Sequence, residues 1–360
     1  MKISTKRDKL FYFNELKSDQ IRQTIDTEQL FEAWMAVNAE LSHRFAGAMA
    51  WKTVSGRDYL YRKTTTSWKS LGPRSSETEH TYEQFHEGRS ERRQRLATLS
   101  TRLDEMAAIN RAMRLGRMPL ITARILRALN KADLIGKALD IVGTNALFAY
   151  ERLGGIKIDS GLLATGDIDL LFDARTNLNL LRRNIGAGGL MGILRTADKS
   201  FHPISKRSFR ATNSNGYLVD LIGPMPSHPL DNSKPAAIGE NEDDLAAVEI
   251  EGLQWLVNSP KVTAIVLDER GYPVQYTCPD PRSFALHKLW LSRREDRDPL
   301  KKLRDEAQAH AVADMIGRYL PHLRFDDAVL GAVPKSLRKL SRELNEATRK
   351  SPDDKIEPNW

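Results

Sequence analysis

The sequence predicts an α+β protein: a mixed β-sheet with packed helices, preceded by an N-terminal region of helices with one β-hairpin and followed by a C-terminal helical region. Three observations predict this class. Apolar residues recur at helical spacing in the first third of the 360 residues, short apolar runs bounded by Gly or Asn follow in the middle, and Asp-Pro pairs introduce helical segments near the end. The length suffices for two or three domains.

The N-terminal region has the spacing of long helices interrupted by one hairpin. Apolar residues of 30–41 share one helical face, and this helix is expected to end near His43. Aromatic, β-prone stretches on both sides of Gly56 predict a hairpin, and residues 64–73 are expected to form a loop. Residues 96–113 keep a spacing near 3.5 residues, which predicts a long helix with a packing face.

The pattern changes after Ala138 to short apolar runs. Strands are predicted at 139–143, 167–172, 262–267 and 274–277, and helices at 145–152 and 177–185. Residues 206–212 and 217–222 flank Asn215-Gly216, which predicts a hairpin with a two-residue turn of positive φ. Asp280-Pro281 and Asp298-Pro299 predict helix starts, because each pair offers a capping carboxylate before a first-turn proline.

These patterns suggest four parts. They are a basic N-terminal helical region with a β-hairpin (1–133), a catalytic core (134–278), a C-terminal helical region (279–350) and a disordered tail (351–360).

Charge is distributed unevenly along the chain. Residues 1–130 hold 23 Lys and Arg against 15 Asp and Glu, whereas the remainder is balanced, so the formal excess of +8 lies in the N-terminal third. Such a region favours a polyanionic partner such as RNA, although solubility alone also explains many basic surfaces. A single cysteine, Cys278, and the lack of a secretory signal or a long apolar run predict a soluble cytoplasmic protein with no membrane partner.

Three aspartates are the strongest candidates for chemistry. Side chains alternate along a strand, so Asp167 and Asp169 should project from one face, and Asp220 is likewise set in an apolar strand. Neighbouring carboxylates repel, and a hard divalent cation relieves that repulsion. If the two strands are neighbours, the three carboxylates can hold two Mg²⁺ ions that activate an attacking oxygen and stabilise a leaving pyrophosphate.

Gly143 and Thr144 form a candidate anion site between a strand and a helix. Glycine lets a triphosphate approach the backbone, Thr144 can donate its hydroxyl, and exposed N–H groups at the start of the next helix are expected to face the phosphates.

These residues carry a family resemblance. Gly143-Thr144-Asn145-Ala146-Leu147, Asp167-Ile168-Asp169-Leu170-Leu171 and the apolar-flanked Asp220 resemble the polymerase-beta-type nucleotidyltransferase superfamily. More narrowly, the chain resembles a bacterial nucleotidyltransferase-like group related to abortive-infection nucleotidyltransferase toxins. The resemblance implies a mixed sheet covered by helices, NTP and Mg²⁺ binding, and nucleotide transfer to an acceptor.

The resemblance extends to two residues of later helices. It implies that Lys288 contacts phosphate and that Asp305 is an auxiliary acid near the reacting centre. Taken without the family, Lys288 is a surface lysine and Asp305 an i,i+4 partner of Lys301. Lys206, Arg207 and Arg210 either form a solvated face or meet phosphate.

The leading hypothesis is an Mg²⁺-dependent nucleotidyltransferase. Asp167 and Asp169 would ligate both ions, and Asp220 would ligate the catalytic ion and help to deprotonate the acceptor hydroxyl. Gly143 and Thr144 would hold the triphosphate, and Lys288 would neutralise phosphate charge. The alternatives are a catalytically silent module that binds RNA or a partner protein, and a toxin-like enzyme regulated by a partner. An RNA end, a protein hydroxyl or a small molecule could accept the nucleotide, and the NTP and the oligomeric state stay open.

Overall fold

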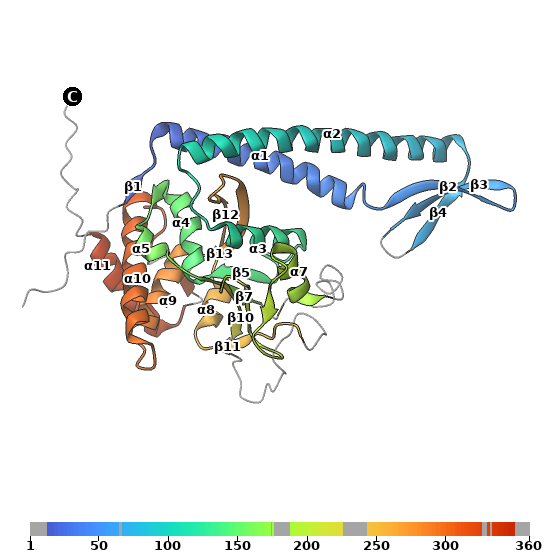
Figure 1. The fold of residues 1–360 in the computed structure, drawn as a ribbon. Coiled ribbons are helices and arrows are strands. Elements are labelled where there is room, and N and C mark those ends of the chain that lie inside the picture. The colour runs from blue at the N-terminus through green and yellow to red at the C-terminus, as the bar shows by residue number, and fades with distance from the viewer. Residues whose placement is uncertain are drawn as a thin grey trace, which may run out of the picture. The chain divides into compact units, whose positions relative to one another are not determined.

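A computed structural model describes residues 13–64, 67–173, 175, 188–225, 243–325, 330–331 and 333–349 of an α+β chain. The chain divides into two compact units (Figure 1). The core unit comprises Met1–Lys17, Arg117–Glu269 and Val274–Trp360, and the arm unit comprises Ser18–Gly116 and Arg270–Pro273. Within the described residues, no helix combines the length and the apolarity that crossing a membrane requires.

Two long helices run side by side in the arm unit (Figure 1): α1 (Ser18–His43) and α2 (Ser76–Ala112). The predicted end of the first helix at His43 and the predicted helical packing face are both confirmed. Ser75 caps α2, because its Oγ accepts from the backbone N–H of Thr78 at 3.3 Å while its own N–H donates to Thr78 Oγ1 at 2.9 Å.

The arm unit also contains a three-stranded antiparallel sheet of β2 (Ala48–Val54), β3 (Arg57–Lys63) and β4 (Trp68–Pro73). The hairpin around Gly56 is confirmed, whereas the loop predicted over 64–73 is wrong. Residues 68–73 pair with β3, with a bulge between Leu60 and Tyr61. One face of this sheet packs on α2 through Met49, Leu60 and Phe85.

The core unit is built on a mixed six-stranded sheet in the order β5-β7-β10-β9-β8, with β11 beside β10. The strands are β5 (Leu139–Val142), β7 (Asp167–Phe172), β8 (His202–Pro203), β9 (Arg210–Thr212), β10 (Leu218–Pro224) and β11 (Val248–Ile250). β10 runs parallel to β7 and β11 and antiparallel to β9. The predicted strand 167–172 is confirmed at both ends. The strand predicted at 139–143 ends one residue earlier, at Val142, because Gly143 has φ +65° and begins a 3₁₀ turn.

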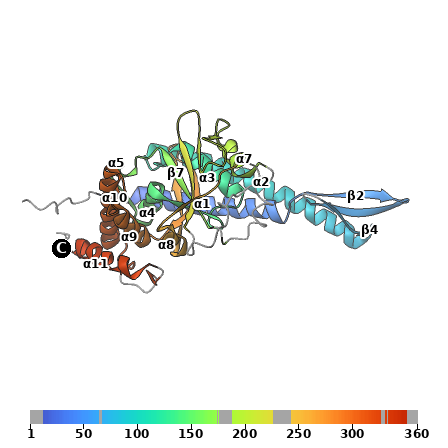
Figure 2. The ribbon, with the colours of Figure 1, turned by 90° about the horizontal axis from the view of Figure 1, so that it is seen from below.

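Helices and two smaller sheets complete the core unit. The helices are α3 (Leu120–Lys131), α4 (Ala146–Gly154), α5 (Ser160–Leu163), α7 (Gly189–Ala197), α8 (Leu253–Asn258), α9 (Pro281–Ser292), α10 (Pro299–Tyr319) and α11 (Lys335–Arg349). The small sheets pair β1 (Asn14–Glu15) with β6 (Ile156–Lys157), and β12 (Lys261–Leu267) with β13 (Pro273–Pro279). Figure 2 shows α9, α10 and α11 side by side.

The two Asp-Pro helix starts are confirmed. Asp280 accepts from the backbone N–H of Arg282 at 2.8 Å, and Asp298 accepts from that of Leu300 at 2.9 Å. Both carboxylates therefore satisfy N–H groups that have no partner within the helix.

The hairpin around Asn215 is confirmed, but its two-residue turn is wrong. Only Gly216 has positive φ, at 76°, and the turn runs from Asn213 to Tyr217 because Asn213 Oδ1 accepts from the backbone N–H groups of Asn215 and Tyr217. The first strand of the pair begins at Arg210 rather than at Lys206. The helix predicted at 177–185 and the tail at 351–360 lie outside the described residues.

The two faces of the central sheet differ in what they bury. Ile168, Leu170 and Val219 are fully buried on one face, where they belong to the main core of the unit. The opposite face carries Leu171 and Ile222 against α8, and also the three candidate aspartates. The site therefore lies on the less completely covered face of the sheet.

Candidate active site

The strand pairing brings the three aspartates together. β7 and β10 lie side by side and parallel, with Asp220 opposite Asp169 and Leu218 opposite Asp167. Register partners project from the same face of a sheet, so the three carboxylates share one face. Burial raises the pKa of Asp169 to about 7, and the charges of Asp167 and Asp220 add to this effect. The three acids thus form one electrostatically coupled group.

Gly143 brings the backbone against this group. It has φ +65° and begins a short 3₁₀ turn, Gly143–Asn145, directly after β5. A Cβ atom at this position would lie 2.2 Å from Asp169 Oδ2, so any side chain here displaces the carboxylate. Asn145 fixes the same turn to β7, because its Nδ2 donates to the carbonyl of Asp167 at 2.8 Å.

The expected row of exposed N–H groups after Gly143 is not what the structure shows. Asn145, Ala146 and Leu147 are buried, and the N–H of Ala146 turns back to the carbonyls of Gly143 and Thr144. The helix that follows therefore begins inside the core, and an anion would meet the 3₁₀ turn rather than the helix.

Thr144 is held by two residues that the sequence reasoning did not select. Its Oγ1 accepts from Arg304 Nη2 at 3.3 Å and from Gln308 Nε2 at 3.2 Å, both of α10. Gln308 is fully buried and lies three residues after buried Asp305, on a stripe that continues with Val312. Polar residues at the apolar positions of an amphipathic helix were the signal that could have found this side of the site.

Arg210 binds the third aspartate. Its Nε and Nη2 donate to Oδ1 and Oδ2 of Asp220, both at 2.6 Å, in a bidentate pair. Asp220 is buried and Arg210 is about one-third exposed. Of the two interpretations open for Arg210, a solvated face is therefore wrong, and the cation neutralises the site from the neighbouring strand.

Lys288 and Asp305 are buried and paired, so the surface interpretation of both is wrong. Lys288 Nζ lies 2.7 Å from Asp305 Oδ1, and Arg297 Nη2 lies 2.8 Å from Asp305 Oδ2. Lys288 also lowers the pKa of Asp169, against the larger effects of burial and the neighbouring acids. Asp305 thus holds two cations beside the carboxylate group.

The carboxylate oxygens of Asp167, Asp169 and Asp220 are of the type that binds magnesium, and the strand register places them next to one another. Three carboxylates on adjacent parallel strands are the hard oxygen ligands that this ion prefers. Within the part of the chain that the structure describes, no group of three or more His, Cys, Asp and Glu side chains is arranged to hold a metal ion. Both oxygens of Asp220 accept from Arg210, so the guanidinium competes with a metal ion for this carboxylate.

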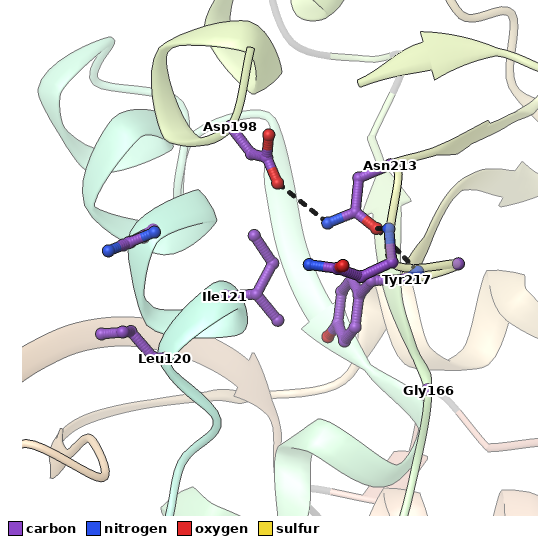
Figure 3. Close-up of a pocket in the computed structure, with 9 residues that line it drawn as sticks. Leu120, Ile121, Gly166, Asp198, Asn213 and Tyr217 are labelled. Atoms are coloured by element: carbon purple, nitrogen blue, oxygen red, sulfur yellow. Dashed lines mark hydrogen bonds between the residues drawn. The ribbon is translucent and has the colours of Figure 1, made fainter. Parts of the chain in front are cut away.

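A pocket of about 360 Å³ opens at the start of the same two strands. Gly166 and Tyr217, which directly precede β7 and β10, line it together with Ile121 of α3 (Figure 3). Asp198 and Asn213 close its upper end through a 3.0 Å hydrogen bond (Figure 3). Burial raises the pKa of Tyr217, and the charges of Asp167 and Asp169 add to this effect. Gly166 directly precedes Asp167, so the pocket adjoins the start of β7, whereas alternation places Tyr217 on the sheet face of Val219, opposite to the carboxylates.

Comparison with known proteins places this geometry in a family. A family model described as Nucleotidyltransferase matches residues 121–334, which include every residue of the site. Neither the curated proteins nor the solved structures contain a match. The resemblance to nucleotidyltransferases is thus confirmed, and the narrower one to abortive-infection toxins stays a prediction. More than half of the chain matches the family model, and the chain belongs to this nucleotidyltransferase family.

Proposed function

We propose that this protein is an Mg²⁺-dependent enzyme that transfers a nucleoside monophosphate from an NTP to an acceptor hydroxyl. One observation carries the proposal: the parallel register sets Asp220 beside Asp169 on the sheet face where Gly143 brings its backbone against the same carboxylate. Coupled carboxylates next to an open backbone are suited to a substrate that is itself a polyanion held through cations.

The three acids divide the work in this proposal. Asp167 and Asp169 would hold both ions, and Asp220 would hold one of them and receive the proton of the acceptor hydroxyl. Two bound Mg²⁺ ions would supply charge stabilisation for the attacking and leaving oxygens. The acceptor oxygen forms a bond to the α-phosphorus, the bond from that phosphorus to the bridging oxygen breaks, and pyrophosphate leaves.

Cations and donors from three elements would bind the triphosphate. Gly143 gives close access to the backbone, and Lys288 contributes positive charge from α9. Thr144 would exchange its contacts with Arg304 and Gln308 for phosphate oxygens, which leaves those two side chains as further donors. This arrangement adds Arg304 and Gln308 to the residues that the sequence motifs indicated.

The nucleoside would occupy the pocket beside Tyr217. Its lining offers the amides of Asn213 and Asn215 and the guanidinium of Arg124, and apolar surface from Ile121. Ligand pockets of this kind combine an apolar wall with a few polar groups that fix orientation.

Labelled nucleotides test the proposal. The full chain is incubated with each α-labelled NTP, Mg²⁺ and total cellular RNA, protein lysate or small hydroxyl compounds, and the labelled species is identified. We expect one acceptor class to take up label, and expect Mg²⁺ plus NTP to raise the melting temperature. Asp169→Asn should remove both effects, because the variant loses a ligand oxygen charge while keeping its shape. The same thermal shift in the variant would contradict the metal assignment.

A catalytically silent binding module is the second candidate, and the Arg210–Asp220 pair favours it. A carboxylate held by two 2.6 Å hydrogen bonds to a guanidinium needs no metal. The variant Arg210→Gln distinguishes the two candidate functions, because it removes the guanidinium that binds Asp220. For the enzyme, this variant should bind Mg²⁺ at least as tightly as wild type. For the silent module, Mg²⁺ should bind neither protein, and no acceptor should take up label.

A further inference from the structure

The sheet of the arm unit has one face that the function proposed above does not use. Side chains alternate along its strands, so the residues facing away from Met49 and Leu60 form a second face. We call this the outer sheet face, and it comprises Lys52, Arg57, Tyr59, Tyr61, Lys63 and Trp68. Its lysines are exposed and Trp68 is 41% exposed, whereas its tyrosines are half-buried.

Cations and aromatic rings interleave on the outer sheet face. Lys52 Nζ lies 3.8 Å from the ring centroid of Trp68 and 5.3 Å from that of Tyr61. Lys63 Nζ lies 5.7 Å from the Trp68 ring. Lysines of two strands thereby contact Trp68, which stays 41% exposed.

The charge of this segment is strongly one-sided. Between Ala48 and Arg74 the sequence has six Lys and Arg residues and one acidic residue, Asp58. Asp58 is opposite Thr53, on the face that carries Leu60, and its carboxylate accepts from Thr53 and Arg74. No carboxylate of these strands therefore balances the cations of the outer sheet face.

We infer that the outer sheet face binds single-stranded RNA. Ring faces that are open to solvent stack on unpaired bases, and cations spaced between them bind the phosphates that link those bases. Trp68 is the stacking platform, and Lys52, Lys63 and Arg57 contact phosphates. A duplex offers no free base face to Trp68, and the hydroxyls of Tyr59 and Tyr61 can bond the ribose 2′-OH that DNA lacks.

The test is equilibrium binding of the full chain to a fluorescein-labelled uridine oligomer of about 20 nucleotides, followed by anisotropy over a range of salt concentrations. Wild type should bind with a steep salt dependence. Lys52→Ala and Lys63→Ala should each reduce the slope of log affinity against log salt by about 0.7, as expected for one lost phosphate contact. Trp68→Ala should weaken binding about tenfold, and Trp68→Phe should retain most of the affinity.

Lys69→Ala is the matched control. Lys69 follows Trp68 directly and pairs with Arg62, so it lies on the opposite face of the same strand. This variant should change affinity by less than about twofold. Equal losses for Lys69→Ala and Lys52→Ala would overturn the inference, as would the absence of RNA binding or equally tight binding of a duplex. Equal affinity for the deoxy oligomer would overturn the assignment to RNA.

The inference does not rest on the proposed transfer reaction. Asp169→Asn should bind the oligomer as wild type does, even though it should lack nucleotidyl transfer. Failure of RNA binding with intact transfer would remove the inference alone, and failure of transfer with intact RNA binding would remove the proposed function alone.

Discussion

The core unit and the arm unit differ in where their cationic side chains lie. In the core unit, Arg210 and Lys288 lie against buried carboxylates at 2.6 and 2.7 Å. In the arm unit, Lys52 and Lys63 lie exposed beside the ring of Trp68. A buried charge pair fixes a geometry and is expensive to disturb, whereas an exposed cation over a ring keeps its charge available to a ligand.

This difference separates two kinds of anion recognition. The buried pairs of the core unit suit a small substrate that must be placed at one reacting atom. The exposed cations of the arm unit suit a long polyanion, for which affinity grows with the number of phosphates contacted and position matters less. The excess positive charge of the N-terminal third therefore includes the exposed cations of the outer sheet face. In the remainder of the chain, where the charges balance, cations of the candidate site are paired with buried carboxylates.

The largest expected effect comes from removing the Asp220 carboxylate, which tests the catalytic role of the core unit. We expect Asp220→Ala to lower turnover by about a hundredfold to ten-thousandfold, the range for loss of a general base or metal ligand. The affinity for NTP should change little, because Gly143 and Thr144 belong to a different turn. Turnover and NTP affinity are measured on one preparation, with Arg210→Gln as the control that keeps the carboxylate. Full activity in Asp220→Ala would refute the two-metal mechanism.

The second largest effect should be the loss of stability when the buried ion pair between Lys288 of α9 and Asp305 of α10 is broken. Asp305→Asn leaves Lys288 and Arg297 without their carboxylate, and the free energy of unfolding should fall by about 3–5 kcal/mol. Chemical denaturation measures this value. Lys301→Ala removes an exposed charge from the same helix and should stay within about 0.5 kcal/mol of wild type. A small effect for Asp305→Asn would show that Asp305 does not hold these cations.

The apolar core of the arm unit should be separable from catalysis. Leu60→Ala empties a fully buried position between the sheet and α2 and should destabilise the arm unit by about 3 kcal/mol. Hydrogen exchange of the β2–β4 amides should then become faster, and RNA binding should weaken, while nucleotidyl transfer to a small acceptor is kept. Lys69→Ala, at an exposed position on the sheet face that carries Leu60, is the control. Parallel loss of transfer would show that the two units do not act separately.

The smallest expected effect is the pH dependence of stability that Glu151, a buried acid of the core unit, should cause. Burial raises the pKa of Glu151 to about 7, against the lowering effect of Arg117. The folded state therefore binds the proton more tightly, so this contribution is full below pH 4.5 and is lost as pH rises to about 7. Relative to Glu151→Gln, wild type should lose roughly 2 kcal/mol of unfolding free energy over this range. A constant difference between the two proteins would contradict the raised pKa.

Local chemistry made much of the fold predictable. Alternation along 167–172, the capping aspartates at 280 and 298, and the end of the first helix at His43 all depend on neighbours within a few residues. The third arm strand, β4, was missed because its pairing with β3 depends on hydrogen bonds that propensity does not describe.

The site was predictable in its residue types and not in their partners. The alternation rule placed Asp167 and Asp169 on one face, but the parallel pairing with β10 joins strands about fifty residues apart, and only the fold sets that register. Arg304 and Gln308 reach Thr144 across 160 and 164 residues of sequence. Lys288 looked like a surface residue because its burial comes from α10, which a local pattern cannot supply.

The arm unit includes the short segment Arg270–Pro273, which the ribosome makes long after the rest of this unit. Asn110 Nδ2 donates to the carbonyl of Gly271 at 2.9 Å, and the hydroxyl of Tyr272 donates to Asp104 at 2.8 Å. A ribosome adding about 5–20 residues per second makes these partners on the order of ten seconds after α2. Until then, water takes the place of these two partners at the C-terminal end of α2. During that interval we expect this end of α2 to be more accessible to chaperones and proteases than it is in the folded chain.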